Sequence, residues 1–119
     1  MIEYLQKFQK NHTITNGLPS NDVRSIVVDS LNSIWAGTSK GLSQFDGVKW
    51  TLVAEIADIS ILYVDSNQDL WTVAGHRLFD KNYQIALEIP ESIRTIAEDN
   101  RRQVWISGSN KIYYRMLDG

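Results

Sequence analysis

The chain has 119 residues, of which 43% are hydrophobic and 22% are charged, and its formal net charge is -2 at pH 7. This length and composition indicate one globular domain and exclude a disordered chain, while the small charge argues against a nucleic-acid partner, because neutralising a phosphate backbone requires a basic surface. The absence of cysteine excludes disulfides and thiolate metal sites, and no stretch approaches the roughly 20 apolar residues of a membrane span.

The first predicted element is a β-strand over residues 3–10, which lacks the apolar core of a signal peptide. Its Phe8 stands where a later strand has Trp50. The segment Asn16-Gly17-Leu18-Pro19 follows and marks a turn.

Three copies of one pattern come next, over residues 22–52, 58–87 and 92–119. Each copy contains a Trp with an Asp six positions before it. The Trp residues are Trp35, Trp71 and Trp105, and the Asp residues are Asp29, Asp65 and Asp99. A fixed period of this size indicates a repeated supersecondary unit.

Each copy is predicted to contain four short antiparallel strands. The first is an apolar run rich in β-branched residues (23–28, 59–64 and 93–97), which is too short for a helix and suits burial on both faces. A polar turn that begins with the repeat Asp separates it from a second strand that carries the Trp, and Asp46-Gly47 marks a later hairpin. Four strands in about 35 residues describe a propeller blade. An αα or βα repeat is excluded, because no segment shows apolar residues at helical spacing.

The two ends of the chain complement each other in this scheme. The third copy stops after its third strand, whereas residues 3–10 form a fourth strand without a blade of their own. Propellers exchange such strands to join their first and last blades, and three blades are too few for a ring, since propellers begin at about four. We therefore predict an all-β fold of three four-stranded blades, half of a six-bladed propeller that a twofold homodimer with strand exchange completes. The alternative is a piece of a longer array.

The first copy resembles the two-component regulator propeller repeat. The resemblance rests on the run from Asn16 to Ile26, on Ile34-Trp35-Ala36-Gly37-Thr38 and on Gly41-Leu42. Copies two and three keep the Asp, the Trp and the following aliphatic residue, but have Val73-Ala74 and Ser107-Gly108 in place of Gly-Thr.

This resemblance implies a sensing or scaffolding role. In that family, many such blades form sensor ectodomains of hybrid histidine kinases in gut bacteria and are associated with detecting glycan fragments. It implies a periplasmic location if the chain is part of such an ectodomain, and a complete chain would instead be cytoplasmic. We expect a non-enzymatic ligand-sensing or binding scaffold without a cofactor, with a carbohydrate or anionic ligand and a homodimeric partner.

The candidate ligand site is the mouth of the central channel. Arg24, Ser60 and Arg94 share one repeat position near the start of the first strand, and arginines there suit carboxylate, phosphate or a polar sugar. The alternative is that each Arg pairs with a nearby loop acid: Asp22, Asp58 or Glu91. Further candidates in the turns between the second and third strands are Lys40, His76, Arg77 and Lys111, which could equally be solvated loop charges.

The repeat anchors are expected to be structural. A Trp at a fixed strand position packs between blades, as Trp50 and Tyr83 are also expected to do near the outer strand, and the repeat Asp residues cap turns. The turn at Asp65 lacks the Gly and Glu of a calcium loop, so no metal is expected. We assign no catalytic residue. The alternatives are a propeller lyase with His76 as its base, or a module whose only task is self-association.

Overall fold

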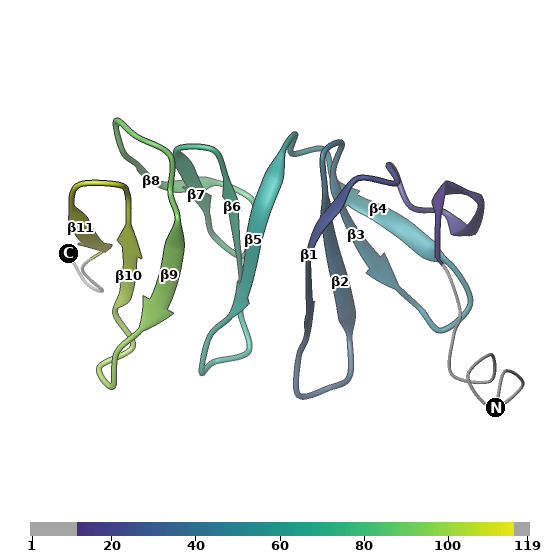
Figure 1. Ribbon diagram of the computed structural model, residues 1–119. Helices are drawn as coiled ribbons and strands as arrows, with labels where there is room; N and C mark the ends of the chain where they lie inside the picture. The colour runs from purple at the N-terminus through teal and green to yellow at the C-terminus, as the bar shows by residue number, and fades with distance from the viewer. Residues whose placement is uncertain (1–11, 116–119) are drawn as a thin grey trace, which may run out of the picture.

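The computed structural model describes residues 12–115, so the predicted strand at residues 3–10 lies outside the described part. Three antiparallel sheets stand side by side in chain order (Figure 1). The prediction of an all-β fold is confirmed. Within the described residues, no helix has the length and hydrophobicity that crossing a membrane requires.

Each sheet contains consecutive strands paired with their neighbours, and we refer to the sheets as blades 1, 2 and 3. Blade 1 contains β1 (Val23–Val28), β2 (Ile34–Thr38), β3 (Leu42–Phe45) and β4 (Trp50–Ala54). Blade 2 contains β5 (Ile59–Val64), β6 (Leu70–Ala74), β7 (Arg77–Phe79) and β8 (Ile85–Glu88). Blade 3 contains β9 (Thr95–Glu98), β10 (Val104–Ser107) and β11 (Ile112–Arg115).

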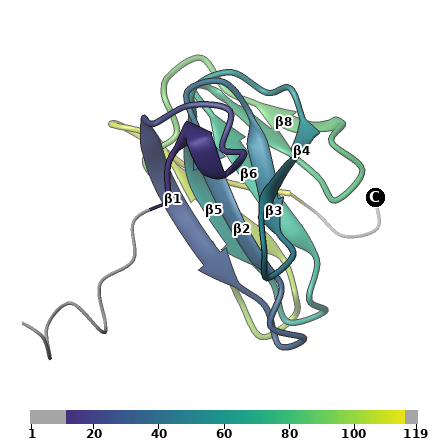
Figure 2. The same cartoon turned by 90° about the vertical axis from the view of Figure 1, so that its right-hand side faces the viewer.

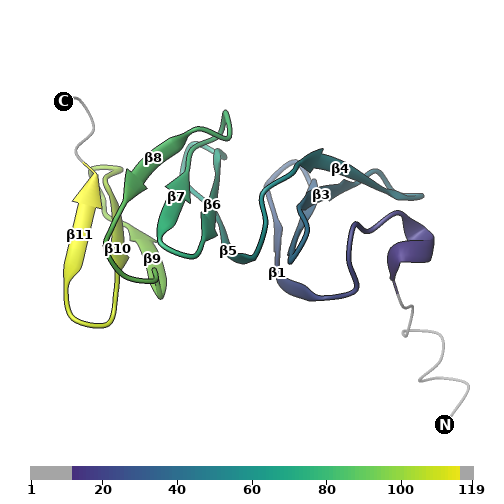
Figure 3. The ribbon, with the colours of Figure 1, turned by 90° about the horizontal axis from the view of Figure 1, so that it is seen from above.

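The blades form a fan. Seen from above, β1, β5 and β9 lie along one side of the row, whereas β4 and β8 lie along the other (Figure 3). Seen from the blade 1 end, the sheets lie one behind another, with blade 1 in front (Figure 2). The first strands therefore line the inner side, where the channel of a propeller would run.

The repeat Asp closes the turn between the first two strands of each blade. In blade 2, Asp65 Oδ1 accepts hydrogen bonds from the N–H groups of Asn67 and Asp69, each at 2.9 Å. Asp29 and Asp99 bind the residues two and four positions later in the same way. The fourth turn residue has a positive φ in every copy: Asn32 (64°), Gln68 (67°) and Arg102 (66°). Such a type I turn with a left-handed residue joins antiparallel strands with a bulge.

The spacing of six between Asp and Trp also has a structural reason. The indole N–H of Trp71 donates to Asp65 Oδ2 at 2.8 Å, and the indole of Trp105 donates to Asp99 Oδ2 at the same distance. Asp29 and Trp35, which are both described, make no such bond. One carboxylate thus caps the turn and binds the Trp of the next strand in blades 2 and 3.

The hydrophobic core lies between adjacent blades. Between blades 1 and 2 it contains Leu42, Ile59, Leu62 and Leu70, with Trp35 packed against them. Between blades 2 and 3 it contains Trp71, Val73, Leu78, Ile89, Ile93, Val104 and Ile106. Each of these two Trp residues therefore faces the next blade along the chain.

Gly37 allows blades 1 and 2 to approach closely. A Cβ atom at this position would collide with the Cγ2 atom of Ile59 and would lie 3.2 Å from its Cβ atom. Blade 2 has Val73 at the equivalent position, and β5 and β9 make fewer contacts than β1 and β5. The size of this one side chain therefore helps to set the distance between blades.

One sequence prediction needs correction. The first strand was expected to be buried on both faces, but Val23, Ile26 and Val28 of β1 are exposed, because no described residue covers that face. Tyr83 lies in the turn before the outer strand β8, with a φ of 62°, and packs against the cluster between blades 1 and 2. Its phenol is partly buried, and this burial raises the pKa of Tyr83.

The residues before β1 form a short capped 3-10 turn, Ile14–Asn16, that ends at Gly17 with a φ of 100°. The Asn21 side chain accepts a hydrogen bond from the N–H of Ile14 at 2.9 Å. Leu18 then packs in a third cluster with Ala36 and Trp50 on the outer face of blade 1. This segment therefore closes part of a face that no preceding blade covers in the described structure.

Candidate functional site

The connections between blades and the turns between second and third strands lie along one edge of the row, the upper edge in Figure 1. Backbone hydrogen bonds hold them together: the N–H of Ser39 donates to Asp22 O at 3.1 Å, and the N–H of Asp58 donates to Ser39 O at 2.9 Å. In blade 2 the N–H of Ile93 donates to Gly75 O at 2.9 Å. This edge of the row carries the predicted channel-mouth residues and is the candidate ligand site.

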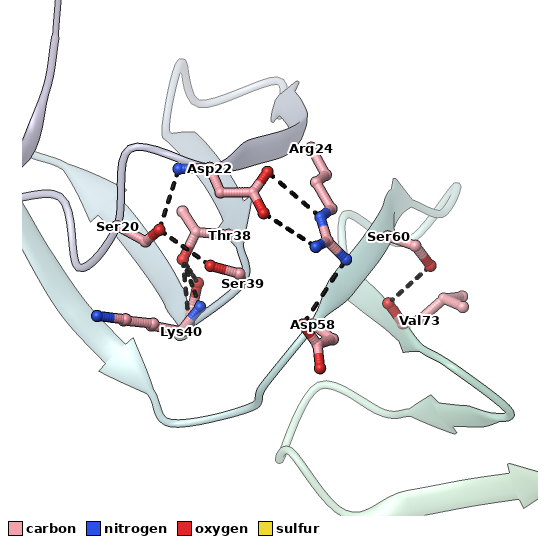
Figure 4. A network of polar contacts seen from close by, with 10 residues as sticks. Ser20, Asp22, Arg24, Thr38, Ser39, Lys40, Asp58, Ser60 and Val73 are labelled. Atoms are coloured by element: carbon pink, nitrogen blue, oxygen red, sulfur yellow. Dashed lines mark hydrogen bonds and ion pairs between the residues drawn. The ribbon is translucent and has the colours of Figure 1, made fainter.

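Arg24 lies between two acids at the junction of blades 1 and 2 (Figure 4). Its Nη2 atom is 2.9 Å from Asp22 Oδ2, and its Nη1 atom is 3.7 Å from Asp58 Oδ1. The hydrogen bond to Asp22 raises the pKa of the Arg24 guanidinium. All three side chains are open to solvent, so this group presents hydrogen-bond donors and acceptors side by side.

Ser60 and Arg94, at the equivalent positions, have different surroundings. The Ser60 hydroxyl donates to the carbonyl oxygen of Val73 at 3.4 Å, within its own blade. Arg94 is exposed and its backbone N–H donates to Ser107 O, while its side chain makes no ion pair within the described part of the chain. The loop acid Glu91, which was an alternative partner for an arginine, instead binds the turn between β10 and β11.

Lys40 and Lys111 are exposed in equivalent turns of blades 1 and 3. The turn at Lys40 is rigid, because Thr38 Oγ1 accepts from the N–H groups of Lys40 and Gly41, both at 3.1 Å, and donates to Gly41 O. The backbone of this turn is thus fixed while the lysine side chain remains in solvent.

His76 and Arg77 both lie close to Glu88, on the same edge of the row, in blade 2. Arg77 Nε donates to Glu88 Oε2 at 2.8 Å, and His76 Nδ1 lies 3.5 Å from the same oxygen. The hydrogen bond from Arg77 lowers the pKa of Glu88. His76 Nδ1 also lies 3.2 Å from Ile89 O, and since a carbonyl only accepts, Nδ1 carries the proton there.

A cleft of about 490 Å³ opens beside this group, between the end of β4 and blade 2. Its lining includes Glu55, His76, Arg77, Phe79 and Tyr83. Charged groups of both signs and two aromatic rings therefore share one concave surface. His76 and Arg77 are neighbours in the sequence and share Glu88 as a partner in the structure. Neither of them contacts Arg24.

Glu91 was not predicted to have its observed role. Its Oε1 atom accepts from the N–H and the hydroxyl of Ser109, each at 2.6 Å, and from the N–H of Asn110 at 3.2 Å, while Oε2 accepts from the Tyr113 hydroxyl at 3.2 Å. The sequence contains no repeat signal for this contact, because the equivalent positions hold Asn21 and Ala57. Glu91 ties the connection before blade 3 to the turn of that blade.

This arrangement predicts an acid-sensitive junction. The hydrogen bonds, first of all that from Ser109, lower the pKa of Glu91 below its ordinary 4.5. A depressed pKa in the folded state means that Glu91 contributes to stability above about pH 4.5, and that this contribution is lost as the pH falls through the folded-state value. Denaturant unfolding should therefore give Glu91→Gln a lower free energy of unfolding than the parent at about pH 6, and this difference should shrink at about pH 3. An equal difference at both pH values would show that the charge of Glu91 is not involved.

Residues 17–40 match the family model described as Two component regulator propeller. This segment is a two-component regulator propeller repeat. In the fold, its Gly17 ends the 3-10 turn with a left-handed backbone conformation, Leu18 packs on blade 1, and Gly37 contacts blade 2. The repeat motif therefore consists of residues that shape one blade and its contact with the next. No curated protein sequence matches the chain.

Solved structures share the fold over most of the chain. The extracellular domain of the hybrid two component system BT3049 from B. thetaiotaomicron is 25% identical, with a TM-score of 0.74 over 89% of this chain. The extracellular domain of the one component system BT4673 from the same organism is 22% identical, with a TM-score of 0.77 over 91% of this chain. This chain spans 17% of each of those two chains.

Virginiamycin B lyase from Staphylococcus aureus shares the fold at lower similarity. It is 16% identical, with a TM-score of 0.62 over 82% of this chain and 42% of the lyase. The resemblance concerns the fold alone. This chain therefore covers only part of the length of each of these solved structures.

Proposed function

We propose that the chain is a non-enzymatic, ligand-sensing propeller module that binds a carbohydrate. The proposal is supported by the propeller repeat at residues 17–40 and by the likeness to extracellular domains of two component and one component systems. Under this proposal the module works outside the cytoplasm, in the periplasm, and its output resides in other segments or proteins.

The charges at the candidate ligand site favour a neutral polar ligand over a strongly charged anion. Arg24 has Asp22 and Asp58 beside it, and Arg77 has Glu88, so the positive charges at these positions are already balanced. An anion would meet these carboxylates, whereas a sugar can accept from the guanidinium and donate to the carboxylate with adjacent hydroxyl groups. The single observation that carries this choice is the exposed Arg24–Asp22 pair.

A binding assay with matched variants tests the proposal. We expect neutral oligosaccharides, screened as a panel, to raise the thermal unfolding temperature of the parent chain, because a ligand that binds only the folded form stabilises it. Arg24→Ala should weaken binding at least about tenfold, since a charge-assisted hydrogen bond contributes about 1.5–3 kcal/mol. Lys49→Ala, in the turn between β3 and β4 at the other end of blade 1, is the control and should bind normally. If no oligosaccharide shifts the parent, or if both variants bind as the parent does, the proposal fails.

We also propose that the ligand-binding unit is a homodimer of six blades. In this arrangement residues 3–10 of each chain add the outermost strand beside β11 of the other. Within the described residues β11 is the last strand of its sheet, so its outer edge offers unpaired backbone groups to such a strand. Sedimentation equilibrium should show twice the mass of one chain, and a stable monomer would contradict the proposal.

A further inference from the structure

The three copies of the repeat bury the same positions to very different extents. Leu42 and Leu78, which both follow the repeat Trp by seven positions, are 0% exposed, but Ile112 at the equivalent position of blade 3 is 71% exposed. At the position six residues before the repeat Asp, Ile59 and Ile93 are 0% and 5% exposed, whereas Val23 of blade 1 is 43% exposed. The exposed copies lie at opposite ends of the row.

A third position shows the same contrast. Leu62 of blade 2 is 4% exposed, and its equivalent in blade 1, Ile26, is 60% exposed. Leu62 and Ile59 are buried because they pack in one cluster with Leu42 of the preceding blade. Blade 1 thus presents the surface that accepts a preceding blade, and blade 3 presents the surface that contacts a following one.

We infer that these two exposed surfaces bind each other between two copies of the chain, in the geometry of the blade 1–blade 2 contact. Ile112 and Ser107 of one copy would then pack on Val23 and Ile26 of the other. This inference rests on the proposed homodimer and identifies the faces that form it. The contact is head-to-tail, and two equal contacts close a ring of six blades.

The inference depends on continuity with an interface that the chain already contains. Every blade contact inside the chain joins the Trp-bearing face of one blade to the first strand of the next. Blade 3 retains this face, with Trp105 stacked on Tyr114 at 4.6 Å between ring centroids. In size, Ser107 lies between Gly37 and Val73, which occupy the equivalent position in the two blade contacts inside the described chain. A second copy carries a matching surface for each of the two exposed faces.

Engineered cysteines can test the assigned faces, because the chain has no cysteine of its own. The Cβ position at Gly37 lies 3.2 Å from the Cβ atom of Ile59, which is close to the separation of about 3.5–4.5 Å that a disulfide spans. The equivalent pair across the inferred contact is position 107 of one copy and position 23 of the other. The double variant Val23→Cys with Ser107→Cys should therefore form a covalent dimer on mild oxidation with diamide. Blade 2 separates the two positions within one chain, so no internal disulfide can form.

A matched double variant controls for random collisions. Val48→Cys with Ser107→Cys places the first cysteine on an exposed residue of the turn between β3 and β4, away from the inferred contact, and should remain uncrosslinked. A single dimer band for the test variant, with at least about tenfold more crosslinking than the control, supports the inference. A ladder of higher oligomers would overturn the closed ring, and equal crosslinking of both variants would overturn the assigned faces.

Sedimentation of the parent separates this inference from the proposed homodimer. A dimeric parent whose cysteine variant does not crosslink would leave the homodimer standing and overturn these faces, whereas a monomeric parent would overturn both. As a second readout, Ile26→Arg and Ile112→Arg should each weaken dimerisation at least about tenfold. Mixing the two variants should restore part of the dimer mass, since one contact of the mixed pair contains both native faces. Leu31→Arg, on an exposed turn residue, should not alter the mass.

Discussion

Replacing Leu78 by alanine should lower the free energy of unfolding by about 2–5 kcal/mol. Leu78 is fully buried in β7, where it belongs to the cluster that joins blades 2 and 3. Truncation removes three carbon atoms from this cluster and leaves a cavity that surrounding side chains fill only in part. Because the cluster joins two blades, we expect two effects. Blade 2 should lose internal order, and blade 3 should lose its packing against blade 2.

Urea unfolding followed by tryptophan fluorescence measures this effect, since Trp71 lies in the same cluster. Leu31→Ala is the matched control, because Leu31 is 83% exposed in the first turn of blade 1. Its unfolding free energy should differ from the parent by no more than about 0.5 kcal/mol. Equal losses in the two variants would contradict the assignment of the core to the spaces between blades.

Asp65→Ala should destabilise the chain by about 3 kcal/mol, more than the same change at the equivalent Asp29. Asp65 is 8% exposed, and its carboxylate accepts from two turn N–H groups and from the indole of Trp71. The substitution removes all three acceptor contacts inside the fold, and hydrogen bonds to a charged group are the stronger kind.

Asp29→Ala provides the comparison within the same chain. Its carboxylate makes the two turn bonds but not the indole bond, so we expect a loss of about 1 kcal/mol, as for other capping residues. Denaturant unfolding of both variants measures the difference. If the two losses are equal within error, the bond between Asp and indole contributes nothing, and the spacing of six has another cause.

The blade itself could be predicted from local sequence. The turn chemistry of Asp65 involves residues two and four positions away, and the short apolar run around Trp71 is a property of one strand. Both are short-range, so the element order follows from the residues in sequence. The bounds of the outer strands were less predictable: β4 begins only at Trp50, three residues after the hairpin signal Asp46-Gly47, because Asp46 binds the N–H groups of Val48 and Lys49 and extends the turn.

The candidate site was only partly predictable. Arg24 could be assigned to the start of the first strand, but its placement between Asp22 and Asp58 requires the second blade to lie beside the first. The grouping of Glu88 with Arg77 likewise joins β8 to β7 across a sheet. Such contacts depend on the relative positions of separate strands, which no local pattern specifies.

By itself, the sequence determined the repeated unit, because the spacing of Asp, Trp and aliphatic residues reflects hydrogen bonds and strand alternation within one blade. Only the tertiary structure decided which copies of an equivalent position are buried, since Leu78 is covered by a neighbouring strand and blade, whereas Ile112 lies in an edge strand that no described blade covers. It also decided the contact of Glu91 with Ser109, which the other copies lack. The physical reason is that a repeat encodes the same surfaces in each blade, whereas burial depends on the neighbour that each surface meets.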